Sequence, residues 1–193
     1  SQSGNTDSLV TRVDAVAFDY SSQKIIFDFA ICLPTASVPC FTADSVEYWS
    51  IGIYDLRREA FEYPFPSQSS DFDVGFPRFA SNSNRFFVYD RLDWSEFDEL
   101  QSTISTIHQY DVDSGDDLMI ANADPGNFWP LTFGLPSNDG DDKYIVFQQF
   151  DSLGGRAKRI PVTGFVPATD EQVELSPFDV AMPVMHRNAV RDV

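Results

Sequence analysis

The sequence predicts an all-β fold built from repeated four-stranded antiparallel meanders. Aromatic residues make up 15% of the chain, and Phe alone contributes 18 residues, which suits the half-buried surface of a pleated sheet. Aromatic and β-branched runs alternate with short polar turns, a pattern typical of β-hairpins. The same order of runs then recurs along the chain, and such recurrence indicates a repeat architecture.

The clearest copy of the meander lies in residues 72–123. Two apolar runs flank an Asn/Ser-rich turn at 80–84, which predicts a hairpin. A third run follows and is separated from a fourth by the turn Asp113-Ser114-Gly115. The expected strands are 72–79, 86–89, 106–112 and 117–120.

Equivalent residues mark the other copies. Pro77, Pro130 and Pro183 recur at one constant interval, each inside an apolar run. A basic residue opens the second strand of each copy, and a Tyr-Asp pair ends the third strand of the first two copies. These residues are Lys24, Arg85 and Lys143, and then Tyr54-Asp55 and Tyr110-Asp111.

The repeat divides the chain into a leader, three units, a partial unit and a tail. In the first unit we expect strands at 13–18, 24–30, 46–54 and 60–63. The boundaries are 1–12 for a flexible leader, about 13–65, 72–123 and 125–177 for the units, 178–185 for a partial unit of one strand, and 186–193 for the tail.

A strand with a proline, a polar turn, a basic residue opening the next strand, and a Tyr-Asp pair before a turn resembles the blade of TolB-type (WD-like) β-propellers. The resemblance covers about Val13 to Met185. It implies propeller-type blades and a role as a protein-binding scaffold.

Propellers close with about four to eight blades, so about three blades and one extra strand leave a ring open. A second chain could complete the ring as a homodimer, the chain could be one segment of a longer protein, or the meanders could pack as a sandwich or open stack.

Composition excludes several classes of partner. The formal net charge is -17 and the sequence pI is about 4.2, so the surface repels phosphate backbones, and nucleic acid and anionic lipid are not expected partners. No apolar run reaches the length of about 18 residues that a membrane-spanning helix requires.

The two cysteines, Cys32 and Cys40, lie in one Pro-containing loop. A disulfide between them would indicate an oxidising compartment, either periplasmic or extracellular. The alternative is a pair of reduced, small apolar residues. Their spacing matches no zinc motif.

Two further segments are candidate sites. The first is a short predicted helix with Asp93 as its N-cap, which places Trp94, Phe97 and Leu100 near one face. This helix is either a lid on its own unit or an epitope for a protein partner. Clustered carboxylates in the first turn of the third unit could bind calcium, although the sequence favours a solvated Asp-Gly turn. They are Asp139, Asp141 and Asp142. No other cofactor is expected.

The remaining ligand-binding candidates are Asp28, Asp90 and Trp49. Asp28 and Asp90 follow equivalent second strands, whereas the third unit has Gln148 or Gln149 at the matching place. An asymmetric carboxylate pair beside an aromatic ring would suit a sugar ligand or glycoside hydrolysis.

No catalytic motif accompanies these residues. The sequence has two histidines and no GxSxG turn, and His108 is expected to be structural. We therefore expect a non-enzymatic, secreted or envelope-associated interaction scaffold. The alternatives are a carbohydrate-binding or carbohydrate-active propeller (a lectin or glycosidase fragment) and the propeller part of a larger hydrolase.

Overall fold

The computed structural model describes residues 9–32, 47–65, 72–81, 83–93, 104–122, 127–133, 144–151, 154–163, 166–167 and 173–174. All regular secondary structure in these residues is β and forms three antiparallel sheets in chain order. The predicted all-β fold of repeated four-stranded meanders is confirmed. None of the described residues forms a helix that could cross a membrane.

The first sheet has its four strands in sequence order. They are β1 (Leu9–Phe18), β2 (Lys24–Cys32), β3 (Glu47–Asp55) and β4 (Ala60–Glu62). β1 begins at Leu9, so residues 9–12, which the sequence analysis assigned to the leader, belong to the sheet. The reason is that β2 runs on to Cys32, where Leu9 pairs with Cys32 and Val10 with Ile31.

The second sheet repeats the same order of strands. They are β5 (Phe72–Phe79), β6 (Phe86–Asp93), β7 (Ile104–Asp111) and β8 (Asp117–Asn122). The third sheet has the order β12-β11-β10-β9, with β13 pairing β11. Its strands are β9 (Asn127–Phe133), β10 (Tyr144–Asp151), β11 (Gly154–Thr163), β12 (Val166–Pro167) and β13 (Val173–Glu174).

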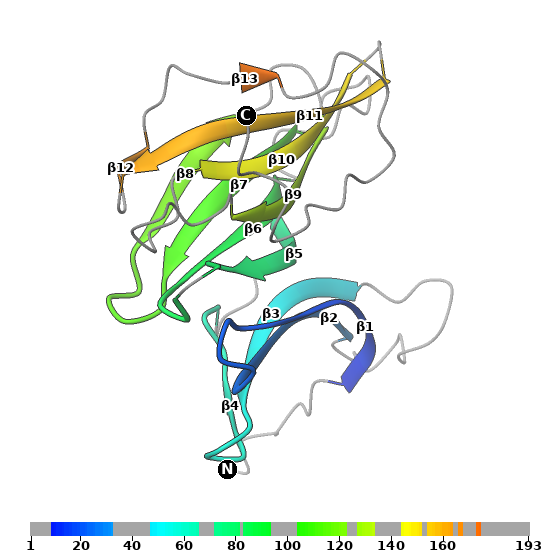
Figure 1. Ribbon diagram of the computed structural model, residues 1–193. Coiled ribbons are helices and arrows are strands. Elements are labelled where there is room, and N and C mark those ends of the chain that lie inside the picture. The colour runs from blue at the N-terminus through cyan, green and yellow to red at the C-terminus, as the bar shows by residue number, and fades with distance from the viewer. Residues whose placement is uncertain are drawn as a thin grey trace.

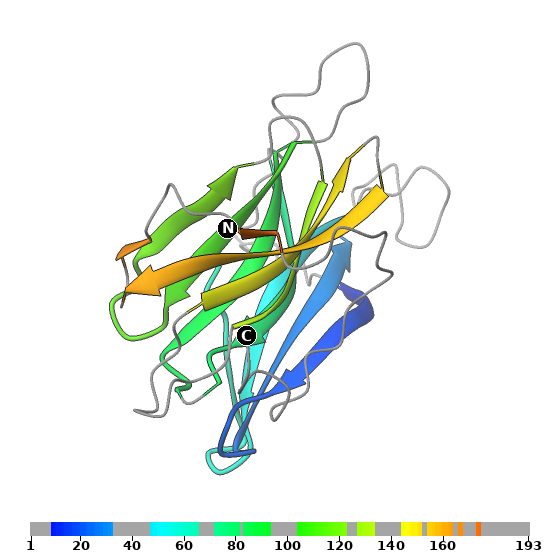
Figure 2. The same cartoon turned by 45° about the horizontal axis from the view of Figure 1, so that its top comes forward.

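The three sheets stack face to face, with the first below, the second in the middle and the third above in Figure 1. β1, β2 and β3 contact β5, while β5, β6 and β7 contact β9. The first strands of the second and third sheets, β5 and β9, therefore lie against the preceding sheet, and Figure 2 gives a second view of the three sheets.

Two apolar clusters hold the stack together. The first joins Ile26, Ile51 and Ile53 of the first sheet to the second sheet, whose contribution is Val74, Phe79, Phe87 and Tyr89. The second joins the second sheet to Ile145 of the third and contains Ala80, Val88, Ile107 and Ile120. Each fully buried side chain of this size contributes about 1.5–3 kcal/mol, so burial between sheets is the main force that orders the repeats.

Turn chemistry also repeats. Asp55 ends β3 and accepts hydrogen bonds from the backbone N–H groups of Arg57 and Arg58, both at 2.9 Å. Asp111 ends β7 and accepts in the same way from Asp113, at 3.0 Å, and from Ser114, at 3.4 Å. The Tyr-Asp pair recurs because its carboxylate caps the turn into the fourth strand.

The first strand of each sheet is irregular. The register shifts between Val13 and Val16 in β1, between Gly75 and Arg78 in β5, and opposite Val146 and Phe147 in β9. Pro77 and Pro130 lie in or beside these irregularities, and bulges are positions at which a sheet tolerates proline, which has no N–H to donate. The bulges of β1 and β5 position the site described next.

Candidate functional site

A pocket of about 140 Å³ lies between the first and second sheets. It brings together all three residues that the sequence indicated as ligand-binding candidates, Asp28 on β2, Trp49 on β3 and Asp90 on β6. The other lining residues carry no signal in the sequence that marks them as ligand-binding candidates. These are Asp14 on β1, Asp73, Val74, Gly75 and Phe76 on β5, and Leu92 on β6.

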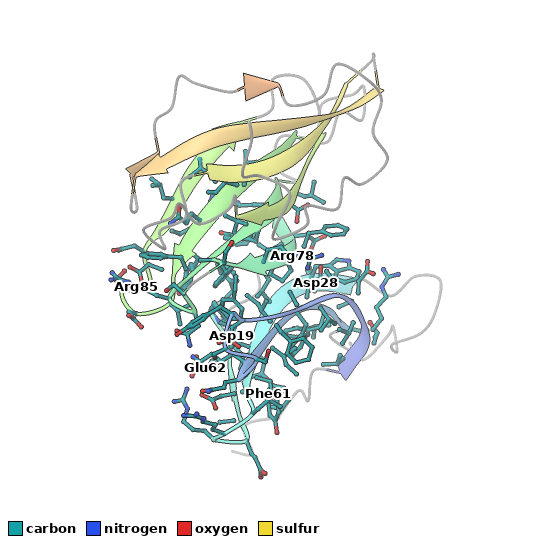
Figure 3. All side chains as sticks on the ribbon, in the orientation of Figure 1. Asp19, Asp28, Phe61, Glu62, Arg78 and Arg85 are labelled. Atoms are coloured by element: carbon teal, nitrogen blue, oxygen red, sulfur yellow. The ribbon has the colours of Figure 1, made fainter. Side chains whose placement is uncertain are left out.

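Asp28 fastens the two sheets together. Its Oδ1 accepts a hydrogen bond of 2.6 Å from the Ala15 N–H in the bulge of β1, and its Oδ2 accepts one of 2.8 Å from the Phe76 N–H in the bulge of β5. Figure 3 shows Asp28 and Arg78 at the junction of the two sheets. The side chain is only 2% exposed, and burial together with the charge of Asp14 raises its pKa.

The two bulges explain why these amide groups are available. A bulge leaves an N–H group outside the strand ladder, and Phe76 adopts the left-handed region, with φ of 48°. That conformation is costly for a bulky residue. The hydrogen bond to Asp28 offsets part of this cost, so the carboxylate and the strained backbone belong to one arrangement.

One oxygen of Asp90 is buried in the pocket without a donor from the described residues. Asp90 is 3% exposed, and its Oδ1 accepts no hydrogen bond from any residue in the described part of the chain. Burial, followed by the charge of Asp28, raises the pKa of Asp90 to about 7. A buried acceptor without a donor is costly, and such a group with a strongly shifted pKa is a candidate functional residue.

Gly75 separates the two carboxylates. A Cβ at this position would lie 3.1 Å from Oδ1 of Asp90 and 3.3 Å from Oδ2 of Asp28. Both distances are shorter than ordinary van der Waals contact, so a side chain here would crowd both oxygens. The glycine therefore keeps this part of the pocket open.

Trp49 and Asp73 form a second link between the sheets. The Trp49 backbone N–H donates a hydrogen bond of 2.9 Å to Oδ1 of Asp73. The guanidinium of Arg12 lies over the Trp49 ring, 4.7 Å from its centroid, which is a cation–π contact. One face of the ring is therefore occupied by the protein's own side chain.

The pocket is acidic. Asp14, Asp28, Asp73 and Asp90 line it, and Arg78, whose pKa is lowered by burial and raised by the nearby Asp28 charge, lies beside them. Among the described residues, no group of three or more His, Cys, Asp or Glu side chains is placed to hold a metal ion. The arrangement suits a hydrogen-bond donor with positive charge better than an anion.

His108 lies in a separate cluster on the second sheet. Its Nε2 is 3.0 Å from the Thr106 hydroxyl, and its Nδ1 is 3.1 Å from Oδ1 of Asp117. The order of these groups resembles a nucleophile, base and orienting acid. However, Thr106 is buried and does not line the pocket, so the cluster fits the structural role expected of His108.

Several predicted site residues fall outside the described part of the chain. They are the partner-binding Trp94, Phe97 and Leu100, the calcium candidates Asp139, Asp141 and Asp142, the strand predicted at 178–185, and Cys40. Cys32 is buried at the end of β2. The disulfide, the short helix and the calcium site remain predictions.

The residues missed from sequence had one available signal. Asp73 belongs to the segment Phe72-Asp73-Val74-Gly75, which recurs as Phe178-Asp179-Val180-Ala181. Asp14 and Arg78 carry no comparable pattern. They enter the site because the bulges of β1 and β5 bring them next to Asp28.

Comparisons with known proteins establish the fold. No family model and no curated protein sequence match the chain. Among solved structures, it is similar to TolB from Acinetobacter baumannii, with a TM-score of 0.50 and 15% identity over 81% of this chain and 31% of that one. It is also similar to the β-propeller domain of the Trilobed protease from Pyrococcus furiosus, with a TM-score of 0.56 and 11% identity over 88% of this chain and 45% of that one.

A third similar structure is an oligogalacturonate lyase in complex with manganese, with a TM-score of 0.49 and 11% identity over 83% of this chain and 51% of that one. The chain thus spans less than two thirds of each of these proteins. The first two likenesses show a TolB-like β-propeller fold, in which each sheet described above is one blade.

Proposed function

We propose that the protein is a non-enzymatic propeller-type interaction module that binds protein partners through the outer face of its first blade. The observation that carries the proposal is a group of exposed apolar side chains on this face. Phe18 is 60% exposed and Phe61 is 55% exposed, and four further exposed apolar side chains come from β1 and the end of the blade. They are Val10, Val13, Val16 and Tyr63.

The strand register places these side chains together. Val13 pairs with Phe29, Val16 with Phe27 and Phe18 with Ile25, and residues directly opposite in a sheet point to the same face. Aromatic rings continue the surface toward β4, since Tyr54 and Phe61 have ring centroids 4.6 Å apart and Phe61 stacks on Tyr63 at 6.1 Å. Figure 3 marks Phe61 on the lower sheet.

The opposite face of the same blade indicates which partner fits. Ile26, Ile51 and Ile53 on that face are fully buried against the second blade. A sheet that is apolar on both faces is typically covered on both sides, and exposed apolar patches of this kind mark interaction surfaces. Another blade is therefore the natural occupant, and a second copy of this chain is the partner to test first.

Location forms part of the same proposal. A secreted or envelope-associated protein lies in an oxidising compartment, where disulfides form and persist. The predicted Cys32–Cys40 disulfide would therefore fit such a location. Titration of thiols without reductant would find no free cysteine in that case. Two titratable thiols would contradict it.

Light scattering tests the pairing directly. We expect a mass of about twice the 21.7 kDa of one chain, with association strengthened by salt because two acidic chains repel one another at low ionic strength. Phe61→Lys should return the protein to a monomer. Met119→Lys is the matched control, because Met119 is 48% exposed but lies on β8 of the second blade.

A stable monomer at every salt and protein concentration would exclude pairing of two copies. If a soluble paramagnetic probe then failed to reach the side chains of Phe61 and Tyr63 in that monomer, the face would be covered within the chain, and the wider interaction proposal would be wrong.

A carbohydrate-binding or carbohydrate-active protein is the second candidate, because the pocket joins two carboxylates and a tryptophan. Two contacts count against it. Both oxygens of Asp28 already accept backbone hydrogen bonds, whereas a glycosidase requires two available carboxyl groups. Arg12 already covers one face of the Trp49 ring. The propeller part of a larger hydrolase has no separate observation in its favour among the described residues.

A further inference from the structure

The pocket between the first two blades contains a buried acceptor that lacks a donor. Oδ1 of Asp90 accepts no hydrogen bond from the described residues although the side chain is 3% exposed and lines the pocket. Its neighbours are already engaged, since Asp28 binds two backbone N–H groups and Asp73 accepts from Trp49. Oδ1 of Asp90 is therefore the buried acceptor that a donor entering the pocket would satisfy.

Charge decides the kind of donor. The carboxylates that line the pocket with Asp90 are Asp14 of β1, Asp28 of β2 and Asp73 of β5. A cation, Arg78 of β5, interacts with the charge of Asp28. An anion would be repelled. A positively charged donor gains from the excess of carboxylates in this low-dielectric space.

The size and the lining of the pocket limit the rest of the ligand. A volume of about 140 Å³ is close to that of a cavity that accommodates a benzene-sized molecule, roughly 150 Å³. Val74, Phe76 and Leu92 provide an apolar wall. Because the described residues include no group placed to hold a metal ion, an organic cation with a short apolar body fits better than a bare ion.

We propose that this pocket binds a primary ammonium group, with the ammonium donating to Oδ1 of Asp90 and a short aliphatic body lying against Val74 and Leu92. The ammonium would come either from a free small amine or from a lysine side chain of a partner. This inference does not depend on the apolar face of the first blade, so the two proposals can fail separately.

The raised pKa of Asp90 adds a second readout. Since this pKa is about 7 and an alkylammonium keeps its proton well above that value, as lysine does at about 10.4, the amine binds best to the ionised carboxylate. Its affinity should therefore increase as the pH rises from 5.5 to 8, and binding should lower the pKa of Asp90.

Titration with n-pentylammonium, followed by NMR chemical shifts of the full chain, tests the proposal. The neutral n-pentanol and glucose serve as comparison probes, and Nα-acetyl-lysine amide tests the lysine source. We expect n-pentylammonium to bind, n-pentanol and glucose not to bind, and Asp90→Asn to weaken amine binding about tenfold or more through loss of a charge-assisted hydrogen bond. Asp113→Asn is the matched control, because Asp113 has a side chain that is 73% exposed, away from the pocket.

The outcomes separate the sources and the alternatives. Binding of n-pentylammonium alone assigns a free amine, and binding of both amines assigns a lysine-like ligand. If n-pentanol binds as tightly, if glucose displaces the amine, or if affinity is unchanged by Asp90→Asn and by pH, the pocket does not recognise an ammonium and the proposal is overturned.

Discussion

The contact between Asp28 and the two bulges leads to a quantitative prediction. Asp28→Asn keeps the shape of the side chain but replaces one of two acceptor oxygens with an NH₂ donor. Only one of the N–H groups of Ala15 and Phe76, now at 2.6 and 2.8 Å from the carboxylate, can still be satisfied. The other would face a donor inside the protein.

The magnitude follows from two opposing effects. Loss of a hydrogen bond to a charged acceptor costs about 1.5–3 kcal/mol, and a buried unsatisfied donor costs a similar amount. In the opposite direction, the neutral amide avoids the desolvation and the repulsion from Asp14 that raise the pKa of Asp28. We therefore expect a net loss of about 2 kcal/mol in the free energy of unfolding, which corresponds to a decrease of about 4–8 °C in Tm for a domain of this size.

Denaturant titration at pH 7 measures this change through the midpoint at an unchanged slope. Asp113→Asn, which removes an exposed carboxylate, should alter stability by less than about 0.5 kcal/mol. If the two variants were equally stable, Asp28 would not be fastening the blades together. An Asp28→Asn protein more stable than the parent chain would show that charge burial outweighs both hydrogen bonds.

Three further predictions concern the pocket and the cysteine loop. Because the pKa of Asp90 is about 7 in the folded state and 3.8 as the ordinary value, its contribution to stability is present at low pH and lost as the pH rises through 7. Relative to Asp90→Asn, the parent chain should lose about 2–3 kcal/mol between pH 5 and pH 8, and parallel stability profiles of the two proteins would contradict this. Gly75→Ala should abolish amine binding by crowding both carboxylates. Gly115→Ala, at a turn with φ of +77°, should cost about 1–2 kcal/mol of stability and leave binding intact, so equal binding by both variants would exclude the crowding. Reduction of the predicted disulfide with dithiothreitol at constant pH should lower the midpoint of thermal unfolding. An unchanged midpoint would show that dithiothreitol broke no disulfide that stabilises the fold.

Much of the fold is predictable because its signals are local. The strand at 24–30 follows from one apolar run and the basic residue, Lys24, that opens it, and the structure extends this strand only to Cys32. The Tyr-Asp pairs are equally local, since the carboxylates of Asp55 and Asp111 bind N–H groups two and three residues further on. Neither observation requires knowledge of how the blades meet.

The pocket is only partly predictable because it depends on contacts between blades. The repeat selects Asp28 and Asp90, since the third unit has glutamine at the matching place. No spacing rule links Asp28 to Phe76, which lies 48 positions further along the chain. That contact depends on two bulges and on the way the blades pack, and the residue pattern of a single strand predicts neither.

The sharing of buried faces has a consequence for how the protein comes apart. Among the described residues, Ile26, Ile51 and Ile53 are buried in one cluster with side chains of the next blade, and Ile145 is joined to the second blade in the same manner. In such a linear array, the stability of each blade depends strongly on the interface that it forms with its neighbour. A blade excised by itself would lose those interfaces, and a defect introduced at one end would propagate to the adjoining blade before it reached the far end.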